Sequence, residues 1–359
     1  MKKRVIKILI YIVCILLICG CESDLTDSSK NTESKEEVST GSLPSEETVS
    51  EESLKPSATP STESVTGSSS QTQSTTEIMR LQVSGDILLS MKESGKTVSA
   101  YGELRNDEYI DALQRLASVL DGYKHNISVV VYSLDNKKAL GYNTAAGIFG
   151  ACTVKAPYAL YCCKQMDSGK VTLDTKMTYQ SKHYETGTGD MQYSPFGTVF
   201  SMETVINKSM GISDNVGYLM MVDCFGRDGY NSYIKNLGCP SLMIKPTVWS
   251  LRTKARELAI AWREIYYYFK SGAMHSDFLY KTCTNTSGNY ATVSIRGVDY
   301  SHKQGHNRTG DWLSYSDAGI VWKAGSPYII AIITDAPGPS SYEQKTFSEI
   351  MQIIHNEIF

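Results

Sequence analysis

Residues 149–155 read FGACTVK and open a stretch whose apolar residues keep helical spacing as far as Met166. In a helix, a lysine three residues after a cysteine lies on the same face, one turn further on. A helix N-terminus stabilises a developing negative charge, and a neighbouring amine favours the thiolate form of a cysteine. This stretch therefore predicts a nucleophile, Cys152, served by Lys155 as a base or as a fixed positive charge.

Two other short strings carry polar side chains suited to the same chemistry. Ser213-Asp214-Asn215 lies between two helical runs, and His302-Lys303-Gln304-Gly305 closes a strand-like run. A serine hydroxyl can relay a proton to a leaving nitrogen, and a lysine at a strand end can attract a carboxylate. Each string alone is short enough to arise by chance, so the prediction of one shared site depends on all three occurring in this order.

The apolar patterns around these strings predict an α+β domain. Helical spacing occurs at 107–123, 153–166, 201–209, 215–224, 253–269 and 347–359. Alternating or β-branched runs occur at 126–134, 137–142, 291–302, 318–322 and 328–334. The order is one helix, two strands, several helices, three strands and a last helix, which predicts a sheet split in sequence by a helical insertion.

The first residues predict an export signal. A basic segment ends at Lys7, an apolar run follows from Ile8 to Ile18, and the run is short for a helix that crosses a membrane. Ile18-Cys19-Gly20-Cys21 resembles a bacterial lipobox, in which the last cysteine is lipidated and becomes the new N-terminus. We therefore expect residues 1–20 to be a lipoprotein signal peptide and the mature protein to be extracellular, anchored through Cys21 to the outer face of the bacterial cytoplasmic membrane. Secretion with cleavage nearby is the alternative.

Residues 21–78 predict a disordered tether rich in Ser, Thr and Glu. They contain no aromatic residue, and twelve acidic residues against three lysines give them a net charge of −9. Such a composition cannot bury enough apolar surface to offset the loss of chain entropy on folding. The whole chain has a net charge of −3 and its first 20 residues carry +4, so residues 79–359, the predicted catalytic domain, are close to neutral. That balance gives no electrostatic reason to expect nucleic acid as a partner.

The three strings together resemble the signatures of the penicillin-recognising acyl-transferase family, specifically class A β-lactamases. Further similar strings are GTGDMQY at 187–193, FGT at 196–198, GVDYSHK at 297–303 and DAGIV at 317–321. The resemblance runs from about Asp107 to the C-terminus. It implies an antiparallel sheet flanked by helices, an inserted all-helical subdomain and a cleft between the two.

The resemblance also implies roles for particular residues. The residues it assigns to catalysis are Cys152, Lys155 and Ser213, and those it assigns to substrate binding are Asn215, Lys303, Gly305 and His306. The backbone N–H groups of Cys152 and His306 would form the oxyanion hole. The implied substrate is a β-lactam or a D-Ala-D-Ala-type peptide of the cell wall.

The sequence departs from the family pattern at three places. Cys152 replaces the nucleophilic serine, and Gln304 replaces the threonine of the third motif. A rival placement of that motif on Arg308-Thr309-Gly310 keeps the threonine and glycine but loses the lysine. Class A enzymes also use a glutamate to activate the deacylating water, and the sequence has no acidic residue between Gly238 and Thr253. Glu257 lies further on, in a helical run without the matching context.

These observations predict a surface-anchored acyl-transfer hydrolase acting through Cys152, with deacylation impaired. The alternative is a catalytically degenerate protein that binds cell-wall peptide. The cysteine spacings match no zinc motif and no pair of histidines is spaced as ligands, so neither a metal nor a cofactor is expected. The expected partners are a small substrate and, through the lipid anchor, a membrane, and the expected state is a monomer.

Overall fold

The computed structural model describes residues 77–245 and 252–359. The chain divides into two units, Met1–Ser70 and Gln71–Phe359, and every described residue lies in the second. The predicted signal peptide, the lipidation of Cys21 and nearly all of the tether lie outside the described residues and remain predictions.

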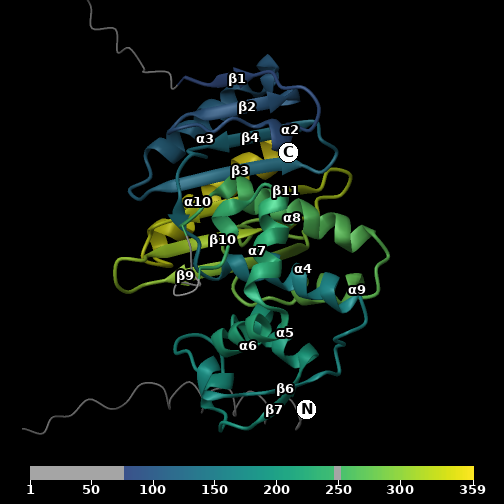
Figure 1. The fold of residues 1–359 in the computed structure, drawn as a ribbon. Coiled ribbons are helices and arrows are strands. Elements are labelled where there is room, and N and C mark those ends of the chain that lie inside the picture. The colour runs from purple at the N-terminus through teal and green to yellow at the C-terminus, as the bar shows by residue number, and fades with distance from the viewer. Residues whose placement is uncertain (1–76, 246–251) are drawn as a thin grey trace, which may run out of the picture. The chain divides into compact units, whose positions relative to one another are not determined.

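A seven-stranded sheet in the order β1-β2-β4-β3-β11-β10-β9 lies at the centre of the described part (Figure 1). Its strands are β1 (Met79–Leu81), β2 (Val98–Gly102), β3 (Ile127–Ser133), β4 (Lys138–Tyr142), β9 (Tyr300–Asn307), β10 (Ser314–Val321) and β11 (Tyr328–Thr334). The β1–β2 pair is parallel, whereas the other neighbours are antiparallel. β9 is an edge strand, and its free edge is therefore available to the functional site.

Helices cover both faces of the sheet. Alternate residues of a strand point to opposite faces, and in β3 Val129 and Val131 join one core cluster while Val130 and Tyr132 join the other. The first cluster includes residues of α3 (Ile110–Asp121) and α10 (Ser341–Ile353). The second includes residues of α4 (Lys155–Met166) and α8 (Ala255–Lys270). This arrangement confirms the predicted α+β fold.

The described residues of the insertion between β4 and β9 form helices, two small strand pairs and the loops between them. Its remaining helices are α5 (Met202–Gly211), α6 (Asn215–Phe225), α7 (Arg227–Asn236) and α9 (Ser276–Thr284), and α2 (Ile87–Ser90) precedes the insertion. The pairs are β5 (Ile148–Phe149) with β8 (Arg252–Thr253), and β6 (Lys176–Thr178) with β7 (Val199–Ser201). Figure 1 shows α5, α6, β6 and β7 together beyond the β9 edge of the sheet.

The predicted strand at 291–302 is wrong over most of its length, because β9 begins only at Tyr300. Before that point, side chains accept hydrogen bonds from the backbone N–H groups. The Asp317 carboxylate accepts the N–H groups of Tyr290 and Ala291, and the Asn289 side chain accepts that of Thr292. Such bonds compete with pairing between strands. The third motif therefore lies in the middle of β9 and does not close a strand as predicted.

Several elements were not predicted at all, namely the four strands of these two small pairs and β1, β2, α2, α7 and α9. They are short, and α7 contains Gly229 and few apolar residues, so helical periodicity is weak there.

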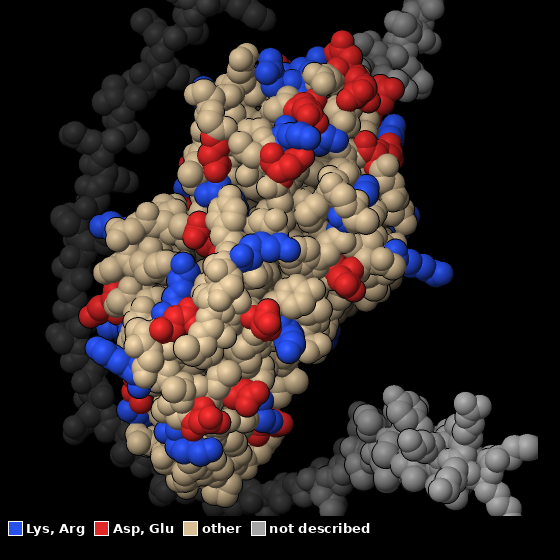
Figure 2. Space-filling model, turned by 90° about the vertical axis from the view of Figure 1, so that its right-hand side faces the viewer, with Lys and Arg blue, Asp and Glu red and all other residues tan. Residues whose placement is uncertain are grey.

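Within the described residues, no helix combines the length and apolar character needed to cross a membrane. On the face shown in Figure 2, acidic and basic side chains are interspersed.

Candidate functional site

The predicted nucleophile lies at the junction between a strand and a helix. Cys152 belongs to a 3-10 turn, Ala151–Val154, that leads directly into α4 at Lys155. The turn is fixed by a left-handed residue, Ala151 with φ 45°, and by the Thr153 hydroxyl, which donates to the Gly150 carbonyl at 2.8 Å. The helix thus starts later than predicted, and the thiol is held at its N-terminal end.

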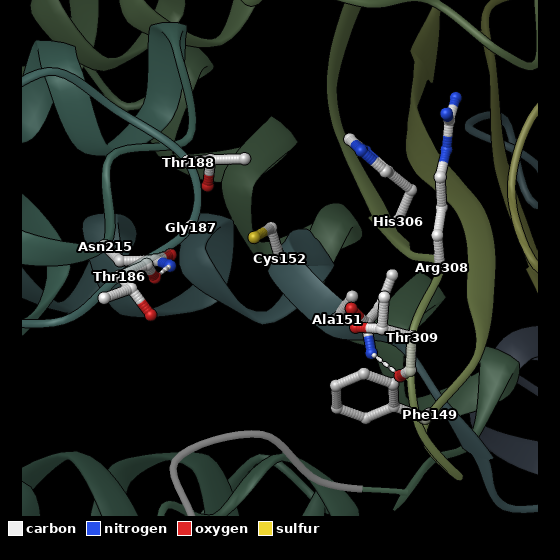
Figure 3. A pocket seen from close by; sticks show the side chains of 11 residues that line it. Phe149, Ala151, Cys152, Thr186, Gly187, Thr188, Asn215, His306, Arg308 and Thr309 are labelled. Atoms are coloured by element: carbon white, nitrogen blue, oxygen red, sulfur yellow. Dashed lines mark hydrogen bonds between the residues drawn. The ribbon is translucent and has the colours of Figure 1, made fainter. Parts of the chain in front are cut away.

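The half-buried Cys152 lines a pocket of ≈ 460 Å³ (Figure 3). The lining residues are Phe149, Ala151, Cys152, Thr186, Gly187, Thr188, Asn215, His306, Asn307, Arg308 and Thr309. Figure 3 shows Cys152 between two groups, with Thr186, Thr188 and Asn215 on one side and His306 and Arg308 on the other. The first group belongs to the helical insertion and the second to the edge of the sheet, so the pocket lies where these two parts meet.

Lys155 is completely buried and joins the first motif to the second. Its Nζ donates to the carbonyl oxygens of Ser213, at 2.6 Å, and Asp214, at 3.2 Å, and to Oδ1 of Asn215, at 2.9 Å. The Asn215 Nδ2 in turn donates to the Thr186 carbonyl at 2.9 Å, which fixes the orientation of the amide. Asn215 therefore orients Lys155, in addition to the role in substrate binding expected for it.

Lys303 joins the third motif to the second. Its Nζ is buried and donates to Ser213 Oγ at 2.8 Å, to the Gln304 carbonyl at 3.0 Å and to Gln304 Oε1 at 3.1 Å. Gln304 thus binds Lys303 from the position where the family pattern has threonine. Lys303 bonds Ser213 Oγ, whereas Arg308 lies in the loop beyond β9. The structure therefore places Lys303, and not the arginine of the rival motif, against the second motif.

The two lysines control the ionisation of Cys152. Burial alone would raise the pKa of this thiol, but the charges of Lys155 and Lys303 and hydrogen bonds from Ser213 and Lys155 outweigh it, so the pKa lies below its ordinary value. Burial lowers the pKa of Lys155, partly offset by Cys152, and lowers the pKa of Lys303 to about 8. The other five described cysteines, Cys162, Cys163, Cys224, Cys239 and Cys283, are unpaired, and burial raises the pKa of each. Cys152 alone among the described cysteines is thus prepared to react as a thiolate.

β9 approaches the nucleophile most closely at Gly305. A Cβ at this position would lie 2.4 Å from the Gly150 carbonyl oxygen and 2.8 Å from the Cys152 backbone nitrogen. Glycine is therefore required for the strand to pack against the 3-10 turn. The next residue, His306, lines the pocket, and its Nδ1 lies 3.1 Å from the Tyr290 hydroxyl oxygen.

The second motif is held by a loop whose contribution was not predicted. The Thr188 hydroxyl donates to the Ser213 carbonyl at 2.7 Å, which supports Ser213 in a left-handed conformation with φ 62°. Asp214 is fully buried, caps α6 through the Gly217 N–H at 2.8 Å and accepts the Met191 N–H at 2.9 Å. The string GTGDMQY was the available signal, but nothing in it indicates which residues contact the motif.

We expect Gly189→Ala to disrupt this loop and with it the second motif. Gly189 has φ +99°, and an added Cβ would lie 2.0 Å from Asp214 Oδ2. Gly169→Ala is the matched control, since Gly169 has φ +81° with open space around it. Both substitutions introduce backbone strain, so the difference between their losses of stability measures the cost of the clash with Asp214. Gly189→Ala should lower the free energy of unfolding by about 1–3 kcal/mol more than Gly169→Ala, measured by denaturant titration. Equal losses would show that the loop yields without cost.

The described residues that line the pocket include no acid. Glu257 is buried on α8, where its Oε2 accepts the Ser241 N–H at 2.6 Å. Four of the other histidines contact carboxylates, in the pairs His125–Glu343, His183–Asp223, His275–Asp167 and His302–Asp317. Among the described residues no group of His, Cys, Asp and Glu could hold a metal ion.

The mixed seven-stranded sheet with helices on both faces has the β-lactamase and transpeptidase-like α+β fold, which similar solved structures share. The chain belongs to the Beta-lactamase enzyme family, whose sequence profile matches residues 111–358. Membership of this family points to an amide hydrolase of the serine-hydrolase type.

Solved structures share the fold at low sequence identity. PBP-A has 20% identity and a TM-score of 0.61, covering 68% of this chain and 95% of PBP-A. A mutant of PBP-A, solved as an acyl-enzyme complex with penicillin G, has 21% identity and a TM-score of 0.58, covering 68% and 94%. A β-lactamase from Chitinophaga pinensis has 20% identity and a TM-score of 0.61, covering 68% and 98%. No protein of curated function matches the chain.

Proposed function

We propose that this protein is a penicillin-recognising acyl-transfer protein that uses Cys152 as its nucleophile and forms a long-lived thioester. The substrates are β-lactams or D-Ala-D-Ala-type peptides of the cell wall. The lipid on Cys21, a prediction from the sequence, would anchor the protein to the outer face of the membrane, where such peptides occur. The fold shared with PBP-A, which is acylated by penicillin G in one of the solved structures, supports the choice of substrate.

The observation that carries this proposal is that the Cys152 thiol at the pocket surface interacts with two buried lysines, Lys155 and Lys303. A substituted but inactive site would have no reason to keep both ammonium groups buried, because desolvation of a charge is costly. Lys155 and Lys303 instead lower the pKa of Cys152 and retain hydrogen bonds to the second motif. The site is therefore built to generate a thiolate.

In the proposed reaction, the Cys152 thiolate attacks the carbonyl carbon, and its own backbone N–H and that of His306 bind the resulting oxyanion. The Ser213 hydroxyl gives its proton to the leaving nitrogen and is reprotonated by Lys303, whose Nζ lies 2.8 Å from Ser213 Oγ. Since Lys303 is buried and already hydrogen-bonded, we assign the substrate carboxylate to Arg308, an exposed cation on the pocket wall.

Intact-mass measurement after incubation with benzylpenicillin tests the proposal. We expect one added penicillin per chain, mapped by peptide digestion to Cys152 and removed by hydroxylamine, which cleaves thioesters. Cys152→Ala should show no adduct, whereas Cys224→Ala, which removes a half-buried cysteine elsewhere, should label like the unmodified protein. Reversible binding without an adduct would instead favour the alternative, a degenerate protein that binds cell-wall peptide.

A further inference from the structure

We propose that a second cavity, between α5 and the loop after α9, binds a short peptide through a free primary amine. Its volume is ≈ 490 Å³, within the range of small-molecule sites. One wall is a face of α5, where Glu203, Asn207 and Gly211 recur at intervals of four residues, and the other is the loop 285–287. No described residue lines both this cavity and the Cys152 pocket. The proposed site is therefore separate from the chemistry at Cys152.

The two walls of the cavity are bonded to each other. The backbone N–H and the hydroxyl of Ser287 both donate to the Gly211 carbonyl, at 2.8 Å and 2.7 Å. The Thr282 hydroxyl, on α9, donates to Asn207 Oδ1 at 2.8 Å. Because these bonds already fix the walls, a ligand would not have to bring them together, and the cost of ordering on binding is reduced.

The charges of the cavity call for a cation. Three charged side chains line it, and two of them neutralise each other, since Lys208 Nζ donates to both carboxylate oxygens of Asp190, at 2.6 Å and 2.7 Å. The third, Glu203, is exposed and has no hydrogen-bond or ion-pair partner among the residues that the structure describes. An ammonium group on the ligand would balance this remaining negative charge.

The uncharged groups of the cavity match a peptide. The Asn285 side-chain amide makes no hydrogen bond within the described chain, so it offers both a donor and an acceptor, as a peptide group requires. Thr286 Oγ1 is buried and has no partner in the same part of the chain. Beside these groups the Ile212 side chain is 42% exposed and could pack against an apolar side chain. A peptide with a free amine satisfies the carboxylate, the amide and the apolar surface together.

The cavity adjoins the backbone that holds the second motif. Ile212, which lines it, directly precedes Ser213 in the chain. The Lys208 carbonyl accepts the N–H groups of Ile212, at 3.2 Å, and of Asp214, at 3.0 Å. A bound peptide would therefore lie against the end of α5 that leads into Ser213 without entering the Cys152 pocket.

Isothermal titration of the full chain with glycyl-L-leucinamide tests the proposal. This probe carries one ammonium group, two amides and one apolar side chain, and it has no carboxylate. We expect saturable binding of one probe per chain, weakened by high salt because the ammonium pairs with an exposed carboxylate. The matched control is N-acetylglycyl-L-leucinamide, which lacks the charge and should bind about 5-fold more weakly.

Substitutions locate the bound probe. Glu203→Gln should weaken binding by about 5-fold, whereas Glu108→Gln, which changes an exposed acid in the turn before α3, should leave it unchanged. Asn285→Ala should also weaken binding, because it removes the free amide. Cys152→Ala should bind like the unmodified protein, so failure of the thioester proposal would not affect this result.

Three results would overturn the proposal. The first is absence of binding, or equal binding of the acetylated probe. The second is loss of binding in Arg308→Ala with none in Glu203→Gln, which would place the probe in the Cys152 pocket. The third is binding of glucosamine but not of the peptide, which would show that the cavity recognises an amino sugar.

Discussion

Lys155→Met should slow acylation of Cys152 by benzylpenicillin by about 10²-fold or more, since it removes the positive charge that most favours the thiolate. The charge of Lys155 is the largest of the influences that lower the Cys152 pKa, so that pKa should rise without it. A raised pKa lowers the thiolate fraction at neutral pH, so the loss should be greatest there and should diminish as the pH rises.

The measurement is the rate of adduct formation as a function of pH, together with the rate of iodoacetamide alkylation at Cys152. Lys164→Met is the matched control, because Lys164 lies on the same helix and contacts the Tyr233 ring away from the pocket. A thermal melt checks that the variant is folded, since Lys155→Met removes a buried donor from the Ser213 and Asp214 carbonyls and from Asn215 Oδ1. Unchanged rates and an unchanged pH profile would show that Cys152 is not activated by Lys155.

Part of the arrangement of the site could be predicted from the sequence because it depends on one short local string. Cys152 and Lys155 are one helical turn apart, so their proximity follows from the helix alone. The contact between Lys303 and Ser213 could be expected only through the family resemblance, because no periodicity relates residues so far apart in the chain. The fold class was likewise predictable from long apolar runs such as β3 and β11, where burial is nearly complete.

The features that could not be predicted depend on hydrogen bonds made by polar side chains. The Asp317 carboxylate accepts the backbone N–H groups of Tyr290 and Ala291, so β9 begins later in the sequence than the apolar pattern predicts. β10 begins at Ser314, before the predicted strand, because its buried serines bond each other and do not show as an apolar run. The hydrogen bond from the Thr188 hydroxyl to the Ser213 carbonyl could not be predicted either, since neither residue type indicates its partner.

The unmodified protein should react with a β-lactam once and then turn over very slowly. Acylation needs only Cys152, the two lysines, Ser213 and the oxyanion donors, all of which the structure places together. Deacylation by water needs a general base, and the sequence from Gly238 to Thr253 supplies no acid for it. The thioester should therefore accumulate, and Cys152→Ser should likewise acylate without efficient turnover if the scaffold accepts an alkoxide.

Stopped-flow absorbance with a chromogenic β-lactam in excess over the full chain tests this account most directly. We predict a burst that corresponds to one β-lactam opened per chain, followed by a steady phase slower than the burst by at least about 10²-fold. The burst should be absent in Cys152→Ala. Rapid multiple turnover without a burst would contradict the account, because it would require a base for water that the described site does not contain, and absence of a burst from the unmodified protein would contradict Cys152 as the nucleophile.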